Sequence, residues 1–317
     1  MNDQIREMQV REMVDKKIRE ETLALFREVE DLFYAQDFSL KEHQGWFQLQ
    51  FTNNLGYRPL WPYEPFVRYS MLKKAWESRI RGERFFTSPC PFFEFVCELR
   101  GYTLAGTVPR DAVVLDVGPW NGISGFYFAA RAEQGRLIFL EPDEDSAKAL
   151  ARDIRLNGFD NCTVVKKALF NATGRAGFIQ KSGGESVLAP GAEADTTVET
   201  ITLADLIKEQ SLDRVDFLKI DIEGAEIHIA EDLARFLEDS PSSWAAVASY
   251  HETEKGHAST VLEQIFQKHP GLFFKTVYPY HETTFVAHKD NTQVCESLKN
   301  FPDCQTGWAA IRRKSGS

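Results

Sequence analysis

The stretch VVLDVGPWNGISG, residues 113–125, decides the fold. Its first five residues are nearly all apolar, which is typical of a short buried strand, and a glycine turn then opens a helical pattern over 124–133. In a sheet of parallel strands, such a junction lies at the carboxyl edge, where ligands bind. Glycines let a ligand approach the backbone closely, and the helix N-terminus presents unpaired amides. The stretch therefore predicts a ligand site at this edge.

The glycine spacing and an acidic residue after the next strand indicate the class of ligand. Gly118, Gly122 and Gly125 follow G-x-x-x-G-x-x-G, one residue longer than the dinucleotide fingerprint G-x-G-x-x-G, which disfavours a pyrophosphate-binding turn. Glu141 ends the strand expected over 136–140, 19 residues past Gly122. An acid at this place accepts both hydroxyls of an adenosine ribose, in a nicotinamide enzyme or an S-adenosylmethionine enzyme. Adenosine is therefore indicated, and the shape of the turn favours the cofactor without a diphosphate.

A third stretch, VDFLKIDIEGAE at 215–226, runs from a buried strand directly into acidic residues. Asp221 and Glu223 are expected at the same carboxyl edge as the glycine turn. Glu223 and Glu226 also suit the N-terminus of the helix that follows, so a purely structural role stays open for them. The next strand ends in Ser-Tyr-His-Glu at 249–252, which brings His251 to the same rim.

Strands and helices alternate from residue 113 onward. Strands are expected at 113–117, 136–140, 162–166, 215–220, 244–249 and 272–278, with helices at 124–133, 145–157, 226–237 and 258–268. This alternation predicts an α/β fold, a mainly parallel sheet with helices on both faces. Glycines and prolines between 170 and 205 predict a hairpin or flap. Segments 283–287 and 308–311 both have strand character, and which of them closes the sheet stays open.

The first 108 residues have a different pattern, and we predict a helical N-terminal cap over 1–108 and an adenosine-cofactor domain over 109–317. Apolar residues over 1–36 recur at helical spacing, so a long helix is expected that packs on its own domain or forms a dimer interface. Fourteen aromatic residues crowd between Trp46 and Phe95, and a helix is expected over Pro65–Arg81. The aromatic residues form the core of the cap, a substrate pocket, or both.

Composition restricts the class of partner and the compartment. The 317 residues, 43% hydrophobic and 26% charged, have the profile of a globular protein of about two domains. A net charge of −10 argues against nucleic-acid and anionic-membrane partners, because phosphates favour a surplus of Lys and Arg. Five cysteines, never spaced C-x-x-C, predict neither a disulfide framework nor a zinc knuckle. Neither a secretory signal nor a run of 18 apolar residues is found, so the cytoplasm is the expected compartment.

Several motifs resemble those of the FkbM-type family of S-adenosylmethionine-dependent methyltransferases. They are D-V-G-x-x-x-G at 116–122, Glu141-Pro142, LNG at 156–158, Ala168-Leu169 and above all LKIDIEGAE at 218–226, and the resemblance covers roughly residues 110–290. It implies a Rossmann-like class I methyltransferase fold with a seven-stranded sheet and, most often, methylation of a hydroxyl on a sugar or secondary metabolite. This chain has Pro119-Trp120 where family members usually carry Ala-Asn. The cofactor contacts implied are Asp116, Gly118, Pro119, Trp120, Asn121, Gly122, Glu141, Pro142, Ala168, Leu169 and Asp221.

Methyl transfer is an in-line displacement at a sulfonium, so alignment of the nucleophile and exclusion of water supply most of the rate. A hydroxyl nucleophile must also lose its proton, and His251 is the leading candidate for the base because imidazole titrates at about 6.5. Asp221 is the second candidate, or it holds the amino group of the cofactor, and Glu223 completes the expected catalytic group. Asp221, Glu223, His251 and Glu252 also have the chemistry of a magnesium site. Because they come from two strands at no fixed spacing, a metal is not the favoured prediction.

Two alternatives of other classes stay open. A nicotinamide-dependent oxidoreductase would share the sheet and Glu141. A non-catalytic partner protein would keep the adenosine site and use the N-terminal region for assembly. The predicted partners of the favoured enzyme are a small-molecule acceptor and, through the N-terminal helix, a second copy of the chain. A zinc protease and a serine hydrolase are excluded, because H-E-x-x-H and G-x-S-x-G do not occur at the relevant positions.

Overall fold

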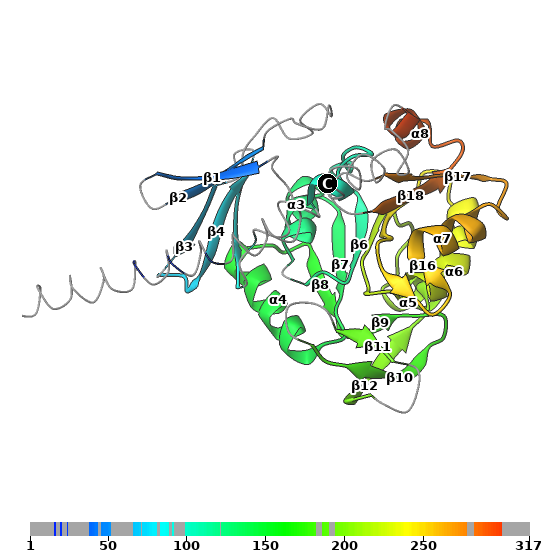
Figure 1. Cartoon of the computed structure of the whole chain (residues 1–317), viewed down its shortest axis with the longest axis horizontal. Coiled ribbons are helices and arrows are strands. Elements are labelled where there is room, and N and C mark those ends of the chain that lie inside the picture. Colours follow the sequence, from blue (N-terminus) through cyan, green and yellow to red (C-terminus); the bar gives the residue numbers. More distant parts are fainter. Residues whose placement is uncertain are drawn as a thin grey trace, which may run out of the picture. The chain divides into compact units, whose positions relative to one another are not determined.

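The computed structural model divides the chain into two compact units, Met1–Val96 and Cys97–Ser317 (Figure 1). In the first unit it describes residues 16, 20, 24, 38–43, 46–51, 66–70, 72–80, 83–88 and 91. In the second unit it describes residues 99–120, 122–181, 186–189, 194–277 and 282–299.

A seven-stranded sheet forms the centre of the second unit, with the strand order β17-β18-β14-β13-β6-β7-β8. β8, β7, β6, β13 and β14 are parallel, whereas β18 is antiparallel to both of its neighbours. β18 is the segment that closes the sheet, and the other candidate, 308–311, lies outside the described residues. The strands are β6 Val113–Val117, β7 Arg136–Leu140, β8 Cys162–Val165, β13 Phe217–Ile220, β14 Trp244–Ala248, β17 Leu272–Val277 and β18 Thr283–His288.

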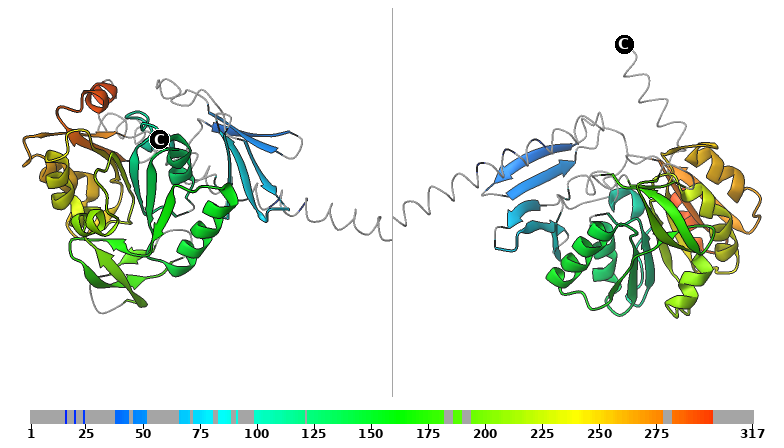
Figure 2. Two further views of the ribbon diagram at one scale, coloured as in Figure 1. Left: turned by 180° about the vertical axis from the view of Figure 1, so that it is seen from behind. Right: turned by 90° about the horizontal axis from the view of Figure 1, so that it is seen from below.

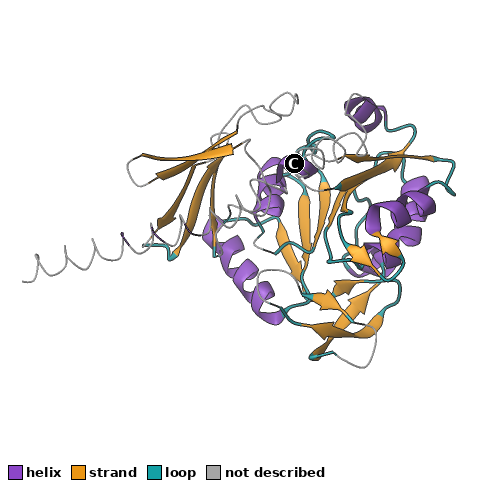
Figure 3. Cartoon of the chain, in the orientation of Figure 1, coloured by secondary structure: helices purple, strands orange, loops and turns teal. Residues whose placement is uncertain are grey.

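Helices lie on both faces of this sheet (Figures 2 and 3). On one face, Phe128 of α3 contacts Phe217 of β13. The next residue, Leu218, points to the opposite face because side chains alternate along a strand, and there it packs in a cluster with Leu233 of α6. No helix in the described part of the chain is long and apolar enough to cross a membrane. The helices of this unit are α2 Leu99–Tyr102, α3 Ile123–Arg131, α4 Glu144–Asn157, α5 Leu203–Glu209, α6 Glu226–Glu238, α7 Ala258–Phe266 and α8 Thr292–Lys299.

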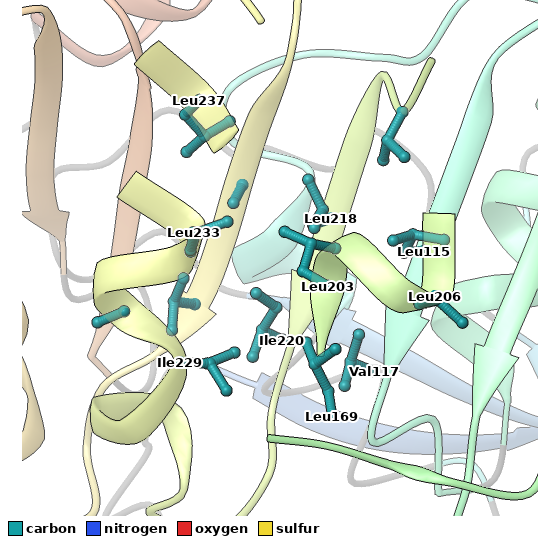
Figure 4. Close-up of a cluster of buried hydrophobic side chains, with 14 of the residues drawn as sticks. Leu115, Val117, Leu169, Leu203, Leu206, Leu218, Ile220, Ile229, Leu233 and Leu237 are labelled. Carbon is teal, nitrogen blue, oxygen red and sulfur yellow. The ribbon is translucent and has the colours of Figure 1, made fainter. Parts of the chain in front are cut away.

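One continuous apolar cluster fills the face that α5, α6 and α7 cover (Figure 4). Burial of each large aliphatic side chain in such a cluster stabilises the fold by about 1.5–3 kcal/mol. The cluster includes Val117 and Ile220, the last residues of β6 and β13, and both are at most 1% exposed. The ends of these two strands are therefore fixed in a rigid core.

The glycine-rich segment between 170 and 205 forms part of a second, four-stranded sheet with the order β11-β10-β12-β9. β10 pairs antiparallel with β11 and β12, and β12 pairs parallel with β9. The predicted hairpin is thus confirmed. The strands of this second sheet are β9 Ala168–Leu169, β10 Gly174–Ile179, β11 Val187–Leu188 and β12 Thr196–Ile201.

The first unit contains a five-stranded antiparallel sheet in its described part, and the prediction of a helical cap with a helix over Pro65–Arg81 is wrong there. Two strands replace that helix, and the turn between them, at 72–74, contains no glycine or proline to announce it. The long helix predicted over 1–36 lies outside the described residues, apart from three helical positions at 16, 20 and 24. The strands are β1 Phe38–His43, β2 Trp46–Phe51, β3 Phe66–Ser70, β4 Ala75–Ile80 and β5 Glu83–Thr87.

Candidate active site

The carboxyl ends of three neighbouring strands are tied together by backbone hydrogen bonds. The N–H of Gly118, directly after β6, donates to the carbonyl of Leu140 in β7 at 3.2 Å. The N–H of Asp221, directly after β13, donates to the carbonyl of Val117 in β6 at 2.9 Å. Glu141 follows β7 directly. Gly118, Glu141 and Asp221 therefore lie at one edge of the sheet, where the strand order reverses on either side of β6.

The turn after β6 is held in a conformation that requires glycine. Gly118 has φ 74°, and a Cβ there would lie 1.7 Å from the carbonyl oxygen of Asp221. Gly122 has φ 77°, and a Cβ there would lie 2.5 Å from Cδ1 of Leu150. Trp120 has φ 43°, a strained value for a residue other than glycine, and such strain gathers at functional sites. The turn is closed by a 2.7 Å hydrogen bond from the Gly122 N–H to the carbonyl of Pro119, and the predicted contact Asn121 lies outside the described residues.

A buried ion pair in the protein interior contacts the backbone of this turn. Asp116 and Lys219 are paired across β6 and β13, their side chains are both 1% exposed, and Lys219 Nζ lies 3.4 Å from Asp116 Oδ1. Lys219 Nζ also donates a hydrogen bond to the carbonyl of Gly118. Burial raises the pKa of Asp116, and the charge of Lys219 opposes this rise. Asp116, a predicted cofactor contact, thus lies in the protein interior beneath the turn.

Glu141 is a buried carboxylate between the end of β7 and the N-cap of α4. Its side chain is 8% exposed, and its Oε1 accepts a hydrogen bond from the N–H of Asp143 at 2.9 Å. Burial raises the pKa of Glu141 to about 7, although the hydrogen bond from Asp143 favours the ionised form. Asp143 in turn caps α4, because its Oδ1 accepts from the N–H groups of Asp145 and Ser146. The backbone around Glu141 is therefore fixed by the helix that follows.

A cavity of about 610 Å³ begins directly after Glu141. Pro142 and Asp143 line it, together with Phe178 and Gln180 of the glycine-rich hairpin. Gln180 Nε2 donates to Asp143 Oδ2 at 2.6 Å, which holds the hairpin to the start of α4. The cavity is therefore bounded by the segment that carries the predicted ribose acceptor.

Ala168 and Leu169, two further predicted contacts, are buried in β9 at 6% and 1% exposure. Leu169 belongs to the main apolar cluster, and Ala168 packs with Phe178 and Val198 of the second sheet. Their side chains stabilise the junction of the two sheets, so a ligand meets at most their backbone.

Four titratable residues converge after β13 and β14. His251 Nε2 lies 3.8 Å from Asp221 Oδ1 and 3.4 Å from Glu223 Oε2, and His251 Nδ1 lies 3.3 Å from Glu226 Oε1. The side chain of Glu226 is fully buried, that of His251 is 10% exposed and that of Glu223 is 28% exposed. The three predicted catalytic residues thus lie together, and Glu226 joins them.

The carboxylates determine the protonation of His251. Burial alone lowers the pKa of His251, because it disfavours the charged imidazolium. The charge of Glu226, the interactions with Glu223 and the charge of Asp221 outweigh burial and raise the pKa to about 11. In this arrangement the imidazole keeps its proton at neutral pH, which is the opposite of what a general base needs.

Two tyrosines that the sequence analysis did not name hold Asp221. The hydroxyl of Tyr102, in α2, donates to Asp221 Oδ2 at 2.9 Å, and the hydroxyl of Tyr250 donates to Oδ1 at 3.5 Å. Lys219 Nζ lies 5.5 Å from the centre of the Tyr102 ring. The contact of Tyr250 could have been predicted from the sequence, because Tyr250 directly precedes His251. The contact of Tyr102 could not have been predicted, because Tyr102 lies far from Asp221 along the chain.

Glu252, the fourth predicted metal ligand, lies apart from this cluster. It belongs to the short hairpin of β15 Glu252–Thr253 and β16 Gly256–His257, where its Oε1 lies 2.9 Å from His257 Nδ1 and its side chain is 81% exposed. One ligand atom from each of Asp221, Glu226 and His251 lies within 4.8 Å of the others. Within the described part of the chain, these three form the group able to hold a metal ion, a different set from the predicted one.

No curated protein matches the chain. Several solved structures are similar to it. The solved structure of Aeropyrum pernix fibrillarin with natively bound S-adenosyl-L-methionine has 14% identity, covers 78% of this chain and 97% of that chain, and has a TM-score of 0.44. The Methanococcus jannaschii fibrillarin pre-rRNA processing protein has 13% identity, 80% and 98% coverage, and a TM-score of 0.40. Residues 116–241 match the family described as methyltransferase FkbM domain, the family that the motifs of the sequence resemble.

Proposed function

We propose that the chain is an S-adenosylmethionine-dependent methyltransferase that methylates a hydroxyl oxygen on a sugar or secondary metabolite. The observation that carries the proposal is the meeting of Gly118, Glu141 and Asp221 at the ends of three adjacent strands. The family match over 116–241 supports methyl transfer as the reaction. The net charge of −10 favours a small-molecule acceptor over a nucleic acid or an anionic membrane.

The residues present fit an adenosyl donor. Glu141 accepts a hydrogen bond from Asp143 through one oxygen, and its carboxylate keeps capacity to accept from ribose hydroxyls. Gly118 and Gly122 offer backbone without side chains, and no described side chain caps the N-terminus of α3. When bound, the donor supplies an electrophilic methyl group on a sulfonium. We assign Glu141 to the ribose and Asp221 to the polar end of the donor.

The acceptor hydroxyl must lose its proton as its oxygen takes the methyl group. The new oxygen–carbon bond forms while the sulfur–carbon bond breaks, and the sulfur leaves as a neutral thioether. We assign the proton to Glu223, which lies beside His251. Glu223 has the most exposed side chain of the three predicted catalytic residues, so it is the group that meets the acceptor, whereas the buried His251 and Asp221 position it.

Calorimetric titration of the full chain tests the donor. We expect S-adenosylmethionine and S-adenosylhomocysteine to bind, and NAD to show no binding. Glu141→Gln removes the charge that accepts the ribose hydroxyls, so it should weaken donor binding by about 10- to 100-fold. Glu133→Gln, an exposed carboxylate that pairs with Arg110 away from the cavity that begins after Glu141, is the matched control and should bind as the wild type does. Binding of NAD in place of the donor would instead support an oxidoreductase.

Transfer of a labelled methyl group to candidate acceptors separates an enzyme from a binding protein. We expect label in hydroxyl-bearing small molecules, identified by mass spectrometry of the products. Glu223→Gln should lower turnover while donor affinity stays within a few fold, because Glu223 is assigned to the acceptor. Tight donor binding without transfer to any acceptor would support a non-catalytic role.

A further inference from the structure

The carboxylate and imidazole cluster after β13 and β14 has the composition of a metal site. We propose that Asp221, Glu226 and His251 bind a divalent transition-metal ion of the Mn²⁺ or Zn²⁺ class. The three residues come from separate parts of the chain: the loop after β13, the first turn of α6 and the loop after β14. The proposal rests on the geometry of this cluster, and only its catalytic consequence rests on the proposed function.

The distances suit a single ion. Two ligands that each lie about 2.1 Å from one ion are about 3 to 4.2 Å apart, depending on the angle between them. His251 Nδ1 lies 3.3 Å from Glu226 Oε1, which is within this range. One atom from each residue lies within 4.8 Å of the others. To bind one ion, the three side chains must turn until each pair of ligand atoms lies within the range above.

Buried polar atoms of the cluster lack partners among the described residues. Glu226 Oε1 accepts from the N–H of Ile222 at 2.7 Å, but Glu226 Oε2 is buried without a hydrogen bond. Both ring nitrogens of His251 are buried as well, and their contacts with the carboxylates lack hydrogen-bond geometry. A buried polar atom without a partner costs about 1–3 kcal/mol, and more when it is charged. An ion bound to Glu226 and His251 would remove this cost.

The negative charges of the cluster also favour a bound cation. Asp221, Glu223 and Glu226 together carry three negative charges around His251, and an imidazolium balances one of them. Lys219, on the strand that directly precedes Asp221, donates to the carbonyl of Gly118 and lies beside Asp116. A divalent ion beside a neutral imidazole would balance two of the three charges and leave Glu223 as the outer carboxylate.

The ligand set selects the kind of ion. One imidazole nitrogen and two carboxylates suit Mn²⁺, Fe²⁺ or Zn²⁺, whereas Mg²⁺ and Ca²⁺ prefer oxygen ligands alone. Three protein ligands leave coordination positions open to solvent or substrate. If the proposed function holds, such a position would take the acceptor hydroxyl and lower its pKa, so that its proton passes to Glu223 more readily.

Metal titration of the full chain, first stripped by a chelator, tests the proposal. We expect one equivalent of Mn²⁺ to bind with a Kd below about 100 μM, measured from the signal of free Mn²⁺ by electron paramagnetic resonance. Co²⁺ should bind in its place and give a visible absorption band typical of nitrogen and oxygen ligation. The absence of bound Mn²⁺, Co²⁺ and Zn²⁺ up to about 1 mM would overturn the proposal.

Substitutions locate the ion. Glu226→Gln keeps an oxygen for the N–H of Ile222 but removes the charge, and His251→Ala removes the nitrogen ligand, so each should weaken Mn²⁺ binding by at least about 100-fold. Glu252→Gln is the matched control, because Glu252 also lies beside a histidine but outside the cluster, and it should bind as the wild type does. Unchanged binding in both cluster variants would overturn the proposal, even if an ion binds elsewhere.

Two further measurements distinguish a failure of the proposed metal site from a failure of the proposed function. Circular dichroism checks that each variant folds, and Asp221→Asn replaces any variant that does not. Donor binding is measured on the metal-free chain. Intact donor binding without metal binding overturns only the metal site, whereas metal binding without donor binding overturns only the proposed function.

Discussion

Replacing Glu141 by glutamine removes a buried carboxylate, and we expect the variant to unfold less readily than the wild type at pH 8. Burial raises the pKa of Glu141 from its ordinary value of 4.5 to about 7, against the hydrogen bond from Asp143. At 1.36 kcal/mol per pH unit, this shift means that the ionised side chain costs the folded chain about 3 kcal/mol.

The sign follows from the protons bound to each state. Between pH 4.5 and pH 7 the folded chain holds a proton on Glu141 that the unfolded chain has lost, so the wild type loses stability as the pH rises through this interval. Glutamine does not titrate. The free energy of unfolding of Glu141→Gln, relative to that of the wild type, should therefore rise by about 2 to 3 kcal/mol between pH 5 and pH 8.

Urea unfolding at several pH values, followed by circular dichroism, measures this difference. Glu144→Gln is the control: the hydrogen bond from Lys166 lowers the pKa of the exposed Glu144, so the loss of that carboxylate should bring no gain that grows with pH. If the difference between Glu141→Gln and the wild type were the same at pH 5 and pH 8, the carboxylate would not be desolvated, and the reasoning would be refuted.

Two further substitutions test the turn and its support. Gly118→Ala should lower the free energy of unfolding by more than about 3 kcal/mol, since its Cβ would lie 1.7 Å from the Asp221 oxygen. Gly158→Ala has a similar φ but nothing within 4 Å of its Cβ, so a loss of about 1 kcal/mol is expected in the same urea assay. Equal losses would show that the close contact is not real. Lys219→Met leaves Asp116 buried without its countercharge and should cost about 3–5 kcal/mol, with part of it recovered by adding Asp116→Asn. No recovery in the double variant would mean that the two charges do not interact.

The sheet of the second unit could be predicted because its signals are local. β6 and β7 begin and end at the predicted residues, and α4 begins and ends within one residue of the prediction. Asp143 and Gly158 mark its two ends in the sequence as well as in the structure.

The first unit could not be predicted in the same way. Strand β4 buries Glu77 and Ser78 at 2% and 0% exposure, so the alternation of apolar and polar residues that announces a strand is lost. Glu77 is buried because Arg68, its partner across the sheet, forms an ion pair with it at 2.6 Å. Such a pairing depends on the register of two strands, which composition does not reveal.

The candidate site, too, could be predicted only in part. Gly118, Glu141 and Asp221 could be placed at one edge because each directly follows a strand. The protonation of His251 could not be foreseen, because it depends on how closely Glu226 and Glu223 approach the ring. The buried contact of Tyr102 with Asp221 likewise joins residues that only the folded chain brings together.

A crystal structure of the chain with S-adenosylhomocysteine tests the central claim most directly. We predict density for the ribose at the carboxylate of Glu141 and for the amino acid end beside Gly118 and Asp221. Density for the nucleoside at any other place, or side chains that fill the space between Gly118 and Glu141, would contradict the account.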